Sequence, residues 1–280
     1  FYISAWRDGQ DIVDIGRLNV EEEAVRANVR HNCAQGWPQI VPHETNDFET
    51  LILGGGPSLG AFDEEIKVQR TTGAKLVTLN GAYQWALDHG LVPSAQVIVD
   101  ARPFNARFTK PVIDGCKYLL ASQCHPSVFE GLPRDRTYLW HTPTEPIRDL
   151  LDTAFPVWYG VPGGSPVLLR AIPLLRMLGY RKFRLYGCDS CLVGGAHHAY
   201  RQPENDSDVT IPVVVTGGRV FHCYPWMLAQ AQEMLALIKF LGHEIELSIA
   251  GDGLLAHILD VGAALDDMAV LSAAEMPKEA

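Results

Sequence analysis

The sequence predicts a doubly wound α/β fold with a mostly parallel, Rossmann-like sheet and a helical N-terminal extension. From about residue 50 onward, short apolar segments typical of strands alternate with segments typical of helices. Polar and glycine residues follow directly after most of the apolar segments. In a parallel sheet these positions form the edge at which ligands bind, so the same pattern also predicts a site.

The pattern divides the chain into three parts. Residues 1–47 precede the alternation and are predicted to be a helical extension, with a helix at Val20–Val29 whose first turn is acidic. Gly36–Trp37–Pro38 is expected to break this helical part. Residues 48–262 are predicted to be one Rossmann-like nucleotide-binding domain, and residues 263–280 are an Ala-, Met- and acid-rich C-terminal tail.

Seven short, mostly apolar segments are predicted to be strands, because glycine or polar residues bound them. In chain order they are Thr50–Leu53, Lys75–Leu79, Ala95–Val99, Tyr118–Ala121, Thr137–Trp140, Lys182–Tyr186 and Glu244–Ser248. Three segments between them are predicted to be helices, namely Ala82–His89, Pro166–Leu178 and Pro225–Leu241. The proline that opens the second helix is acceptable in a first turn.

Composition limits the partners of the protein. Its 280 residues, 47% of them hydrophobic and 20% charged, are enough to bury a sizeable core. The net charge of −10 argues against general binding of nucleic acid. A phosphorylated ligand must therefore be attracted locally, through amides or a few basic side chains. No apolar run reaches the roughly 18 residues that a membrane span needs.

Cysteine content and the first residues favour a cytoplasmic protein. The six cysteines are expected to be reduced thiols, because the chain is long and not cysteine-dense. Cys188 and Cys191 have redox-motif spacing but follow a late strand, so we interpret them as two buried or edge thiols. The N-terminal residues lack the basic-then-apolar order of a signal peptide. The sequence is compatible with a homo-oligomer.

The most informative motif is a glycine-rich turn directly after the first predicted strand. It consists of Gly54, Gly55, Gly56, Pro57 and Ser58. Glycines allow backbone amides to approach a phosphate, and the Ser58 hydroxyl adds a donor. The turn differs from the dinucleotide fingerprint, which has glycine at the position of Leu59, and it lacks the Gly-Lys-Ser/Thr of a P-loop. The alternative is a tight strand-to-helix turn without a ligand.

Charged side chains at other strand ends are further candidates. Asp100 can accept hydrogen bonds from a ribose or bind a metal, and Arg102 can bind a phosphate; a local salt bridge between them is the alternative. Asp189 is a carboxylate at the end of a later strand, and Asp252 either faces the site or caps a turn. Two weaker candidates for phosphate contact, otherwise solvated, are Arg107 and Lys110.

Histidines supply candidates for proton transfer. His197 and His198 stand in a glycine-rich loop after a predicted strand, at the edge where catalytic groups are expected. Imidazole exchanges protons near neutral pH and can protonate a leaving group; a surface pair is the alternative. His125, at the end of another strand, is a candidate ligand contact together with Ser122 or Gln123.

Four motifs in order resemble the MptE-like family over about residues 50–260. They are Leu51–Leu59, Asn80–Gly81–Ala82 followed by Gly90–Pro93, Val99–Asp100, and Gly163–Ser165 with Leu178–Asp189. This family includes an archaeal 6-hydroxymethylpterin diphosphokinase and bacterial flagellin glycosyltransferases of the Maf type, and the bacterial sialyltransferases that use CMP-sialic acid open similarly. With the core, the run from Ala27 to Pro38 also resembles uncharacterised phage and prophage members.

The resemblance implies roles for individual residues. Gly54–Leu59 would hold the phosphate or ribose of a nucleotide, and Asn80 with Gly81 would contact the same ligand. Gly164 and Ser165 resemble a second nucleotide-contacting turn, and His222 resembles the general base of the sialyltransferases. Two features depart from the pattern: the tyrosines that those transferases place near the leaving phosphate have no clear match, and Asp100 is the only acid where pterin kinases carry Asp-x-Asp.

These features together predict a nucleotide-binding transferase, most simply a glycosyltransferase. Its donor would be a nucleotide-activated sugar of the CMP, UDP or GDP type, with His222 as base and no metal. His197, His198 or Arg102 would stabilise the charge on the leaving phosphate. One alternative is a diphosphokinase that uses ATP and magnesium, which needs more than one acidic ligand. Another is a non-catalytic nucleotide-binding phage accessory protein.

Overall fold

The computed structural model describes residues 20–164, 166–200, 210–215 and 218–262, together with three short strands outside these ranges. Its centre is a seven-stranded parallel sheet with the order β11–β8–β3–β4–β5–β6–β7. These strands are β3 (Glu49–Leu53), β4 (Lys75–Leu79), β5 (Ala95–Ile98), β6 (Lys117–Ala121), β7 (Thr137–Trp140), β8 (Lys182–Tyr186) and β11 (Glu246–Ile249).

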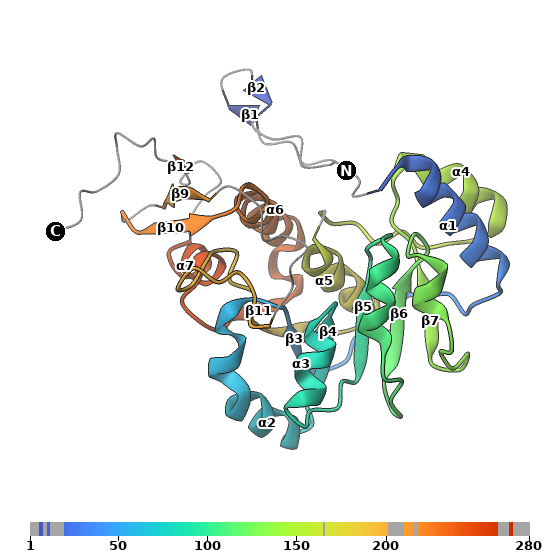
Figure 1. Cartoon of the computed structure of the whole chain (residues 1–280), viewed down its shortest axis with the longest axis horizontal. Helices are drawn as coiled ribbons and strands as arrows, with labels where there is room; N and C mark the ends of the chain where they lie inside the picture. Colours follow the sequence, from blue (N-terminus) through green and yellow to red (C-terminus); the bar gives the residue numbers. More distant parts are fainter. Residues whose placement is uncertain are drawn as a thin grey trace.

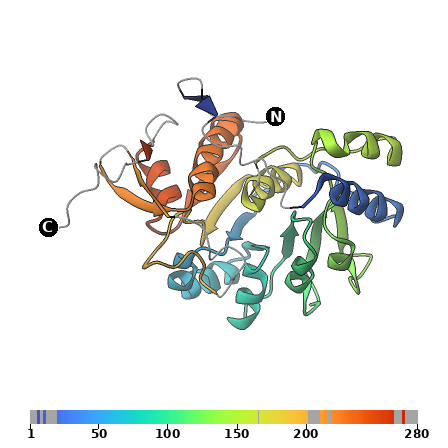
Figure 2. The ribbon, with the colours of Figure 1, turned by 45° about the horizontal axis from the view of Figure 1, so that its top comes forward.

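Helices cover both faces of this sheet. The α-helices are α1 (Glu22–Ala34), α2 (Asp63–Thr71), α3 (Ala82–Asp88), α4 (Glu145–Ala154), α5 (Val167–Met177), α6 (Pro225–Leu241) and α7 (Leu254–Asp260). Short 3-10 helices are η1 (Pro57–Phe62), η2 (Pro103–Thr109), η3 (Pro126–Phe129) and η5 (Gly242–Glu244). Helices α2 and α3 lie on one side of the sheet, and α5 and α6 lie on the other (Figures 1 and 2). The predicted doubly wound fold is therefore confirmed.

The central strands are mostly apolar because both faces of the sheet are covered. In β3, for example, every residue after Glu49 is buried. The polar side chains inside the sheet bond to neighbours, as where the Thr78 hydroxyl donates to Gln96 Oε1 at 2.6 Å. Each predicted strand agrees with an observed one to within two residues at either end.

The order of the strands reverses between β3 and β8. From β3 the chain proceeds through β4, β5, β6 and β7 in one direction, and it then returns to place β8 on the other side of β3. Connections therefore leave the carboxyl ends of β3 and β8 toward opposite faces. In open parallel sheets such a reversal is where ligands bind. The glycine turn follows β3, and Gly187 to Asp189 follow β8, so both lie at this point.

The predicted N-terminal helix is longer than expected and packs on the domain. Helix α1 continues past Val29 to Ala34 and lies beside α4 at the β7 end of the sheet (Figure 1). The Asn28 amide donates to the carbonyl oxygens of Ala101 and Gln123, at 3.3 and 3.0 Å. The helix thus covers the loops that follow β5 and β6. At the carboxyl edge of the sheet, a ligand would therefore bind at the ends of the other strands.

A small antiparallel sheet of strands β10–β9–β12 is absent from the sequence prediction. Its strands are β9 (Ile211–Val214), β10 (Val220–Cys223) and β12 (Ala269–Val270). Near the N-terminus, β1 (Trp6–Arg7) pairs with β2 (Gln10–Asp11). Helices α2, α4 and α7 also have no counterpart among the predicted elements. Among the helices that the structure describes, none has the length and apolar character to cross a membrane.

Candidate functional site

The inner side of the glycine turn packs against the end of β8. An ideal Cβ on Gly54 would lie 2.5 Å from the carbonyl oxygen of Gly187, and one on Gly56 would lie 2.7 Å from the same oxygen. The Gly56 amide donates to this oxygen at 2.7 Å. Gly54 and Gly56 are therefore needed for the close approach of two backbone segments.

Asp189 completes this inner contact. Its carboxylate accepts the Ser58 amide hydrogen at 3.1 Å, while its residue is only 3% exposed. Burial raises the pKa of this carboxyl, against the effect of its hydrogen bonds from Ser58, which lower it. The amides of Gly54, Gly56 and Ser58 thus all have acceptors within the protein. The expected use of these amides to bind a phosphate would require exchange of those bonds.

The outer side of the turn faces Tyr200. An ideal Cβ on Gly55 would meet the Tyr200 hydroxyl oxygen, and one on Gly81 would lie 2.7 Å from it. Tyr200 is half-buried as a residue, but burial of its hydroxyl end raises the pKa of the phenol. The outer side is therefore covered by side chains, mainly that of Tyr200, whereas the inner side also meets the backbone of Gly187.

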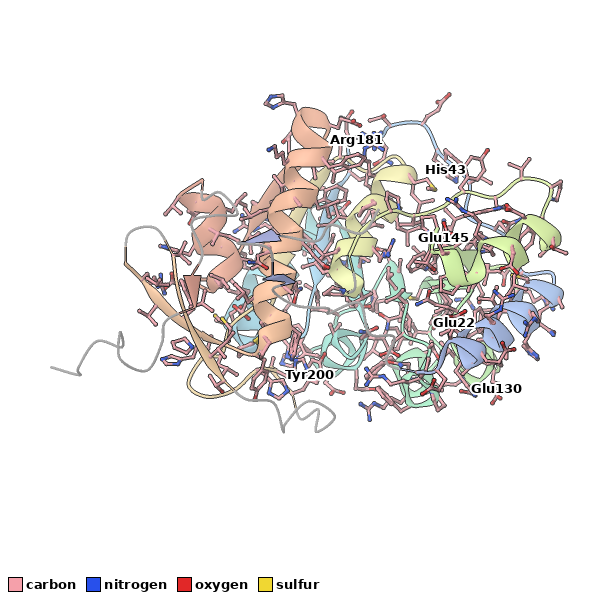
Figure 3. The ribbon with its side chains drawn as sticks, turned by 90° about the horizontal axis from the view of Figure 1, so that it is seen from above. Glu22, His43, Glu130, Glu145, Arg181 and Tyr200 are labelled. Atoms are coloured by element: carbon pink, nitrogen blue, oxygen red, sulfur yellow. The ribbon has the colours of Figure 1, made fainter. Side chains whose placement is uncertain are left out.

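The predicted histidine loop lies on this outer side. His198 Nδ1 is 3.2 Å from the carbonyl oxygen of Gly55, and the rings of His198 and Tyr200 stack with centroids 5.6 Å apart. His197 contacts the ring of Tyr224 edge-on at 5.5 Å. Figure 3 shows Tyr200 near one end of α6, far from the labelled Glu22 and Glu145. The structure therefore brings His198 to the glycine turn, as the sequence pattern suggested for this edge.

Asn80 has an unusual backbone at the same edge. Its φ of +47° is in the left-handed region, which residues other than glycine seldom adopt. The Asn80 carbonyl accepts a hydrogen bond from Gln96 Nε2 at 2.8 Å, which helps to hold this conformation. Its side-chain oxygen is buried without a hydrogen-bond partner among the described residues. Strained residues with unsatisfied polar atoms are typical of ligand sites.

Asp100 and Arg102 form a pair with each other. Arg102 Nη2 lies 2.5 Å from Asp100 Oδ2, and the Arg102 amide also donates to Asp100 Oδ1 at 2.9 Å. This is the local salt bridge that the sequence analysis gave as the alternative to ligand binding. The Arg102 charge is thus partly neutralised before any phosphate approaches. Asp252 is similarly paired, with Arg219 Nη2 at 2.7 Å from its Oδ2.

The remaining predicted residues lie in other surroundings. His222 is exposed on β10, where its carbonyl accepts the Leu192 amide hydrogen at 2.7 Å. Gly164 packs against Glu233 of α6, and its carbonyl accepts a hydrogen bond from Arg170 Nε at 2.9 Å. Ser165 lies outside the described residues.

Three minor candidates have local structural partners. His125 caps η3, since its Nδ1 accepts the Ser127 amide hydrogen at 3.2 Å. Lys110 Nζ donates to the carbonyl oxygen of Glu130 at 2.5 Å. The Arg107 guanidinium lies over the ring of Phe108, 4.8 Å from its centroid.

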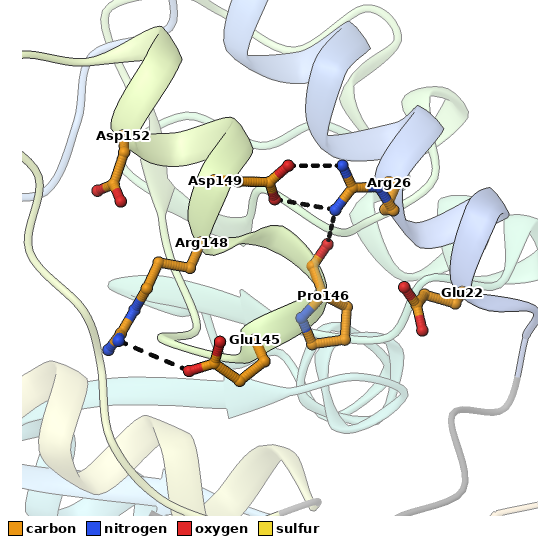
Figure 4. A pocket seen from close by; sticks show the side chains of 7 residues that line it. All are labelled: Glu22, Arg26, Glu145, Pro146, Arg148, Asp149 and Asp152. Carbon is orange, nitrogen blue, oxygen red and sulfur yellow. Dashed lines mark hydrogen bonds and ion pairs between the residues drawn. The ribbon is translucent and has the colours of Figure 1, made fainter.

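A charged groove lies elsewhere, between α1 and α4. Figure 4 shows its lining residues, which are Glu22, Arg26, Glu145, Pro146, Arg148, Asp149 and Asp152. The Arg26 guanidinium makes two hydrogen bonds to the Asp149 carboxylate, at 2.9 and 2.7 Å. None of the predicted site residues lines this groove. We give the strand edge more weight, because the groove is lined mainly by side chains that pair with one another.

Comparison with known proteins identifies the family. A family model described as "6-hydroxymethylpterin diphosphokinase MptE-like" matches residues 24–195, more than half of the chain. This chain belongs to the MptE-like family. The match begins inside α1 and ends at Gly195, just before His197 and His198. No curated protein matches the chain significantly.

A solved structure confirms the fold. The Maf glycosyltransferase from Magnetospirillum magneticum AMB-1 is similar to this MptE-like chain with a TM-score of 0.65 and 20% sequence identity. The similarity covers 86% of this chain but only 38% of that protein. At this identity the comparison shows a shared fold and leaves the activity to be argued from the site.

Tyr200 is the main residue that the sequence prediction missed. Its only signal is its place three residues after His197, at the end of the glycine-rich loop. Gly187, which has a φ of +61° and accepts the Gly56 amide hydrogen, was also missed as a partner of the turn. Both residues act through contacts with segments more than a hundred positions away.

Proposed function

We propose that this MptE-like protein binds a nucleotide at the carboxyl ends of β3 and β4 and acts as a nucleotide-dependent transferase. The observation that carries the proposal is the convergence of Gly55, Asn80 and Gly81 with a histidine loop beside the reversal of the sheet. This is the position at which open parallel sheets bind ligands. The buried, unsatisfied Asn80 oxygen is suited to accept a hydrogen bond from a ribose hydroxyl or a base amine.

The transfer we favour is glycosyl transfer from a nucleotide-activated sugar. An acceptor hydroxyl attacks the anomeric carbon, the bond from that carbon to the phosphate oxygen breaks, and a base removes the proton of the hydroxyl. Charge then develops on the departing phosphate and must be stabilised. The geometry supports His198 for proton transfer more directly than His222, because His198 contacts the glycine turn.

The experiment that tests this proposal is calorimetric titration with CMP, UDP, GDP and ATP, each with and without magnesium. We expect a CMP, UDP or GDP complex that forms without metal, whereas magnesium-dependent binding of ATP alone would favour the diphosphokinase alternative. Asn80→Gly keeps the left-handed backbone and removes the carboxamide, so affinity should fall about tenfold. Asn46→Gly, before β3 at the opposite edge of the sheet, is the matched control.

Measurement of kcat with the sugar donor of the nucleotide that binds then shows which histidine, His198 or His222, transfers the proton. His198→Gln should lower kcat by roughly 100-fold with little effect on nucleotide affinity, as expected for loss of an acid or base. Equal loss in His222→Gln and none in His198→Gln would restore His222 as the base. Absence of binding of all four nucleotides would refute the proposed function itself.

A further inference from the structure

Tyr200 occupies the surface that the proposed nucleotide needs. Its hydroxyl oxygen, Cζ and Cε2 lie against Gly55 and Gly81, so close that a Cβ on Gly81 would be 2.7 Å from the hydroxyl and the ring. Real Cβ contacts are essentially never shorter than 3.0 Å. No ligand atom fits between groups already packed this tightly. A ligand can reach both glycines only after Tyr200 has moved.

The segment that carries Tyr200 is fastened to the turn by further contacts. The Ala199 amide donates to the Gly55 carbonyl oxygen at 2.9 Å, in addition to the His198 contact with the same oxygen. The rings of His198 and Tyr200 are nearly parallel, with an angle of 9° between their planes. The position of Tyr200 is thus set by backbone and ring contacts together.

We propose that Tyr200 covers the nucleotide site, and that the planar base of a nucleotide takes the place of the Tyr200 ring against Gly55 and Gly81. This inference rests on the proposed function. Glycine suits both occupants, because only a residue without a side chain lets a flat ring lie on the backbone. The closed form lowers the apparent affinity by the fraction of molecules that are open.

The contact itself is tested without any ligand, by a double-mutant cycle in thermal unfolding. Gly81 has φ −66° and ψ −15°, which alanine adopts readily, so the obstacle to Gly81→Ala is Tyr200. We expect Gly81→Ala to lower Tm by about 3 °C in the wild-type background and by much less in Tyr200→Ala. Equal losses in both backgrounds would show that the ring does not lie on Gly81 and would overturn the inference.

Closure is tested by titration of CMP, UDP, GDP and ATP into Tyr200→Ala. Affinity for the nucleotide that binds should rise about tenfold, because the open fraction approaches one. Tyr200→Leu lacks the atoms that touch the glycines but keeps apolar packing. Its nucleotide affinity should rise similarly, and it replaces the alanine variant if that variant is unstable. Tyr200→Phe should stay near wild type, and Tyr159→Ala, at a tyrosine 39% exposed, is the matched control.

The outcomes separate the two proposals. Unchanged or weaker binding in both Tyr200→Ala and Tyr200→Leu means that Tyr200 is not in the way, which overturns closure while nucleotide binding stands. Coupling between Gly81 and Tyr200 without nucleotide binding in any variant means that the proposed function has failed, and the exchange of Tyr200 for a base fails with it.

Discussion

Gly54 and Gly56 serve a different purpose from Gly55 and Gly81, although all four stand at one edge of the sheet. The first two allow the backbone at the end of β8 to approach β3, and the other two allow the hydroxyl end of Tyr200 to approach the backbone. A valine at either kind of position would clash. At Gly54 and Gly56 the backbone of Gly187 is among the opposing groups, whereas at Gly55 and Gly81 the nearest opposing atoms all belong to side chains. Gly55 and Gly81 therefore mark the part of the candidate site that a ligand could reach once Tyr200 has moved.

His141 is the residue for which the structure makes the clearest pH prediction. It is 1% exposed, with Nε2 3.0 Å from Gln39 Oε1 and its ring against Phe155 and Trp158. Burial lowers the pKa of this imidazole from 6.5 to about 4. The unfolded chain binds a proton at a higher pH than the folded protein does. Stability should therefore fall between about pH 6.5 and pH 4, by about 3 kcal/mol in total from this group.

Urea unfolding at a series of pH values measures this loss. In His141→Gln the part of the pH dependence that comes from this imidazole should disappear, whatever the stability of the variant at pH 7. His43→Gln, at an exposed histidine, provides the comparison and should keep the wild-type slope. An unchanged slope in His141→Gln would contradict the assignment.

Helix α1 shows how polar contacts place a whole element. Its buried residues are Val25, Asn28, Val29 and Asn32, so half of the buried positions are amides. Asn32 Nδ2 donates to the carbonyl oxygens of Ser122 at 2.9 Å and Cys124 at 2.7 Å, in the loop after β6. These bonds satisfy backbone groups at the carboxyl edge of the sheet and orient the helix there.

Asn32→Ala should lower the free energy of unfolding by about 2 kcal/mol, because two buried carbonyl oxygens lose their donor. Chemical denaturation gives this difference directly. His31→Ala, at the exposed neighbouring position of the same helix, should change stability by less than about 0.5 kcal/mol. If the two variants are equally stable, the amide bonds do not hold α1 in place.

At the scale of the whole molecule, the folded core buries most of the cysteine thiols. All six cysteines are free, five of them buried and Cys33 half-buried. Burial raises the pKa of Cys33 to about 12 and that of Cys191 to about 11. The reactive thiolate is therefore scarce at pH 8 throughout the folded protein.

A thiol-specific reagent such as DTNB should accordingly label no more than one cysteine, Cys33, rapidly in the native protein and all six after denaturation. In a Cys33→Ser variant no cysteine should react rapidly before denaturation. Rapid labelling of two or more thiols under native conditions would mean that the core opens more readily than its packing indicates.

Most of the central sheet could be predicted from local sequence. Lys75–Leu79, Thr137–Trp140 and Lys182–Tyr186 agree with the observed strands at both ends, because each is a short segment rich in apolar or aromatic residues with clear boundaries. The helix at Val20–Val29 was placed correctly but ended too early. Pairing in the small sheet was missed, since β9 and β12 are more than fifty residues apart and neither has a strong local pattern.

Some residues of the candidate site could also be predicted from local sequence, whereas their contacts could not. The glycine turn, Asn80 and the histidine loop were recognisable because glycine, asparagine and histidine at strand ends have chemical reasons to be there. Their nearest neighbours were not recognisable. Nothing local in the sequence links Asp189 to the Ser58 amide, or Tyr200 to Gly55 and Gly81.

By itself, the sequence determined the alternation of strands and helices, the parallel sheet and the edge at which polar residues gather, because hydrophobic period and turn chemistry act over a few residues. Only the tertiary structure decided which side of the glycine turn is closed by backbone and which by Tyr200. That choice depends on close packing between segments more than a hundred residues apart, and close packing is a property of the folded chain.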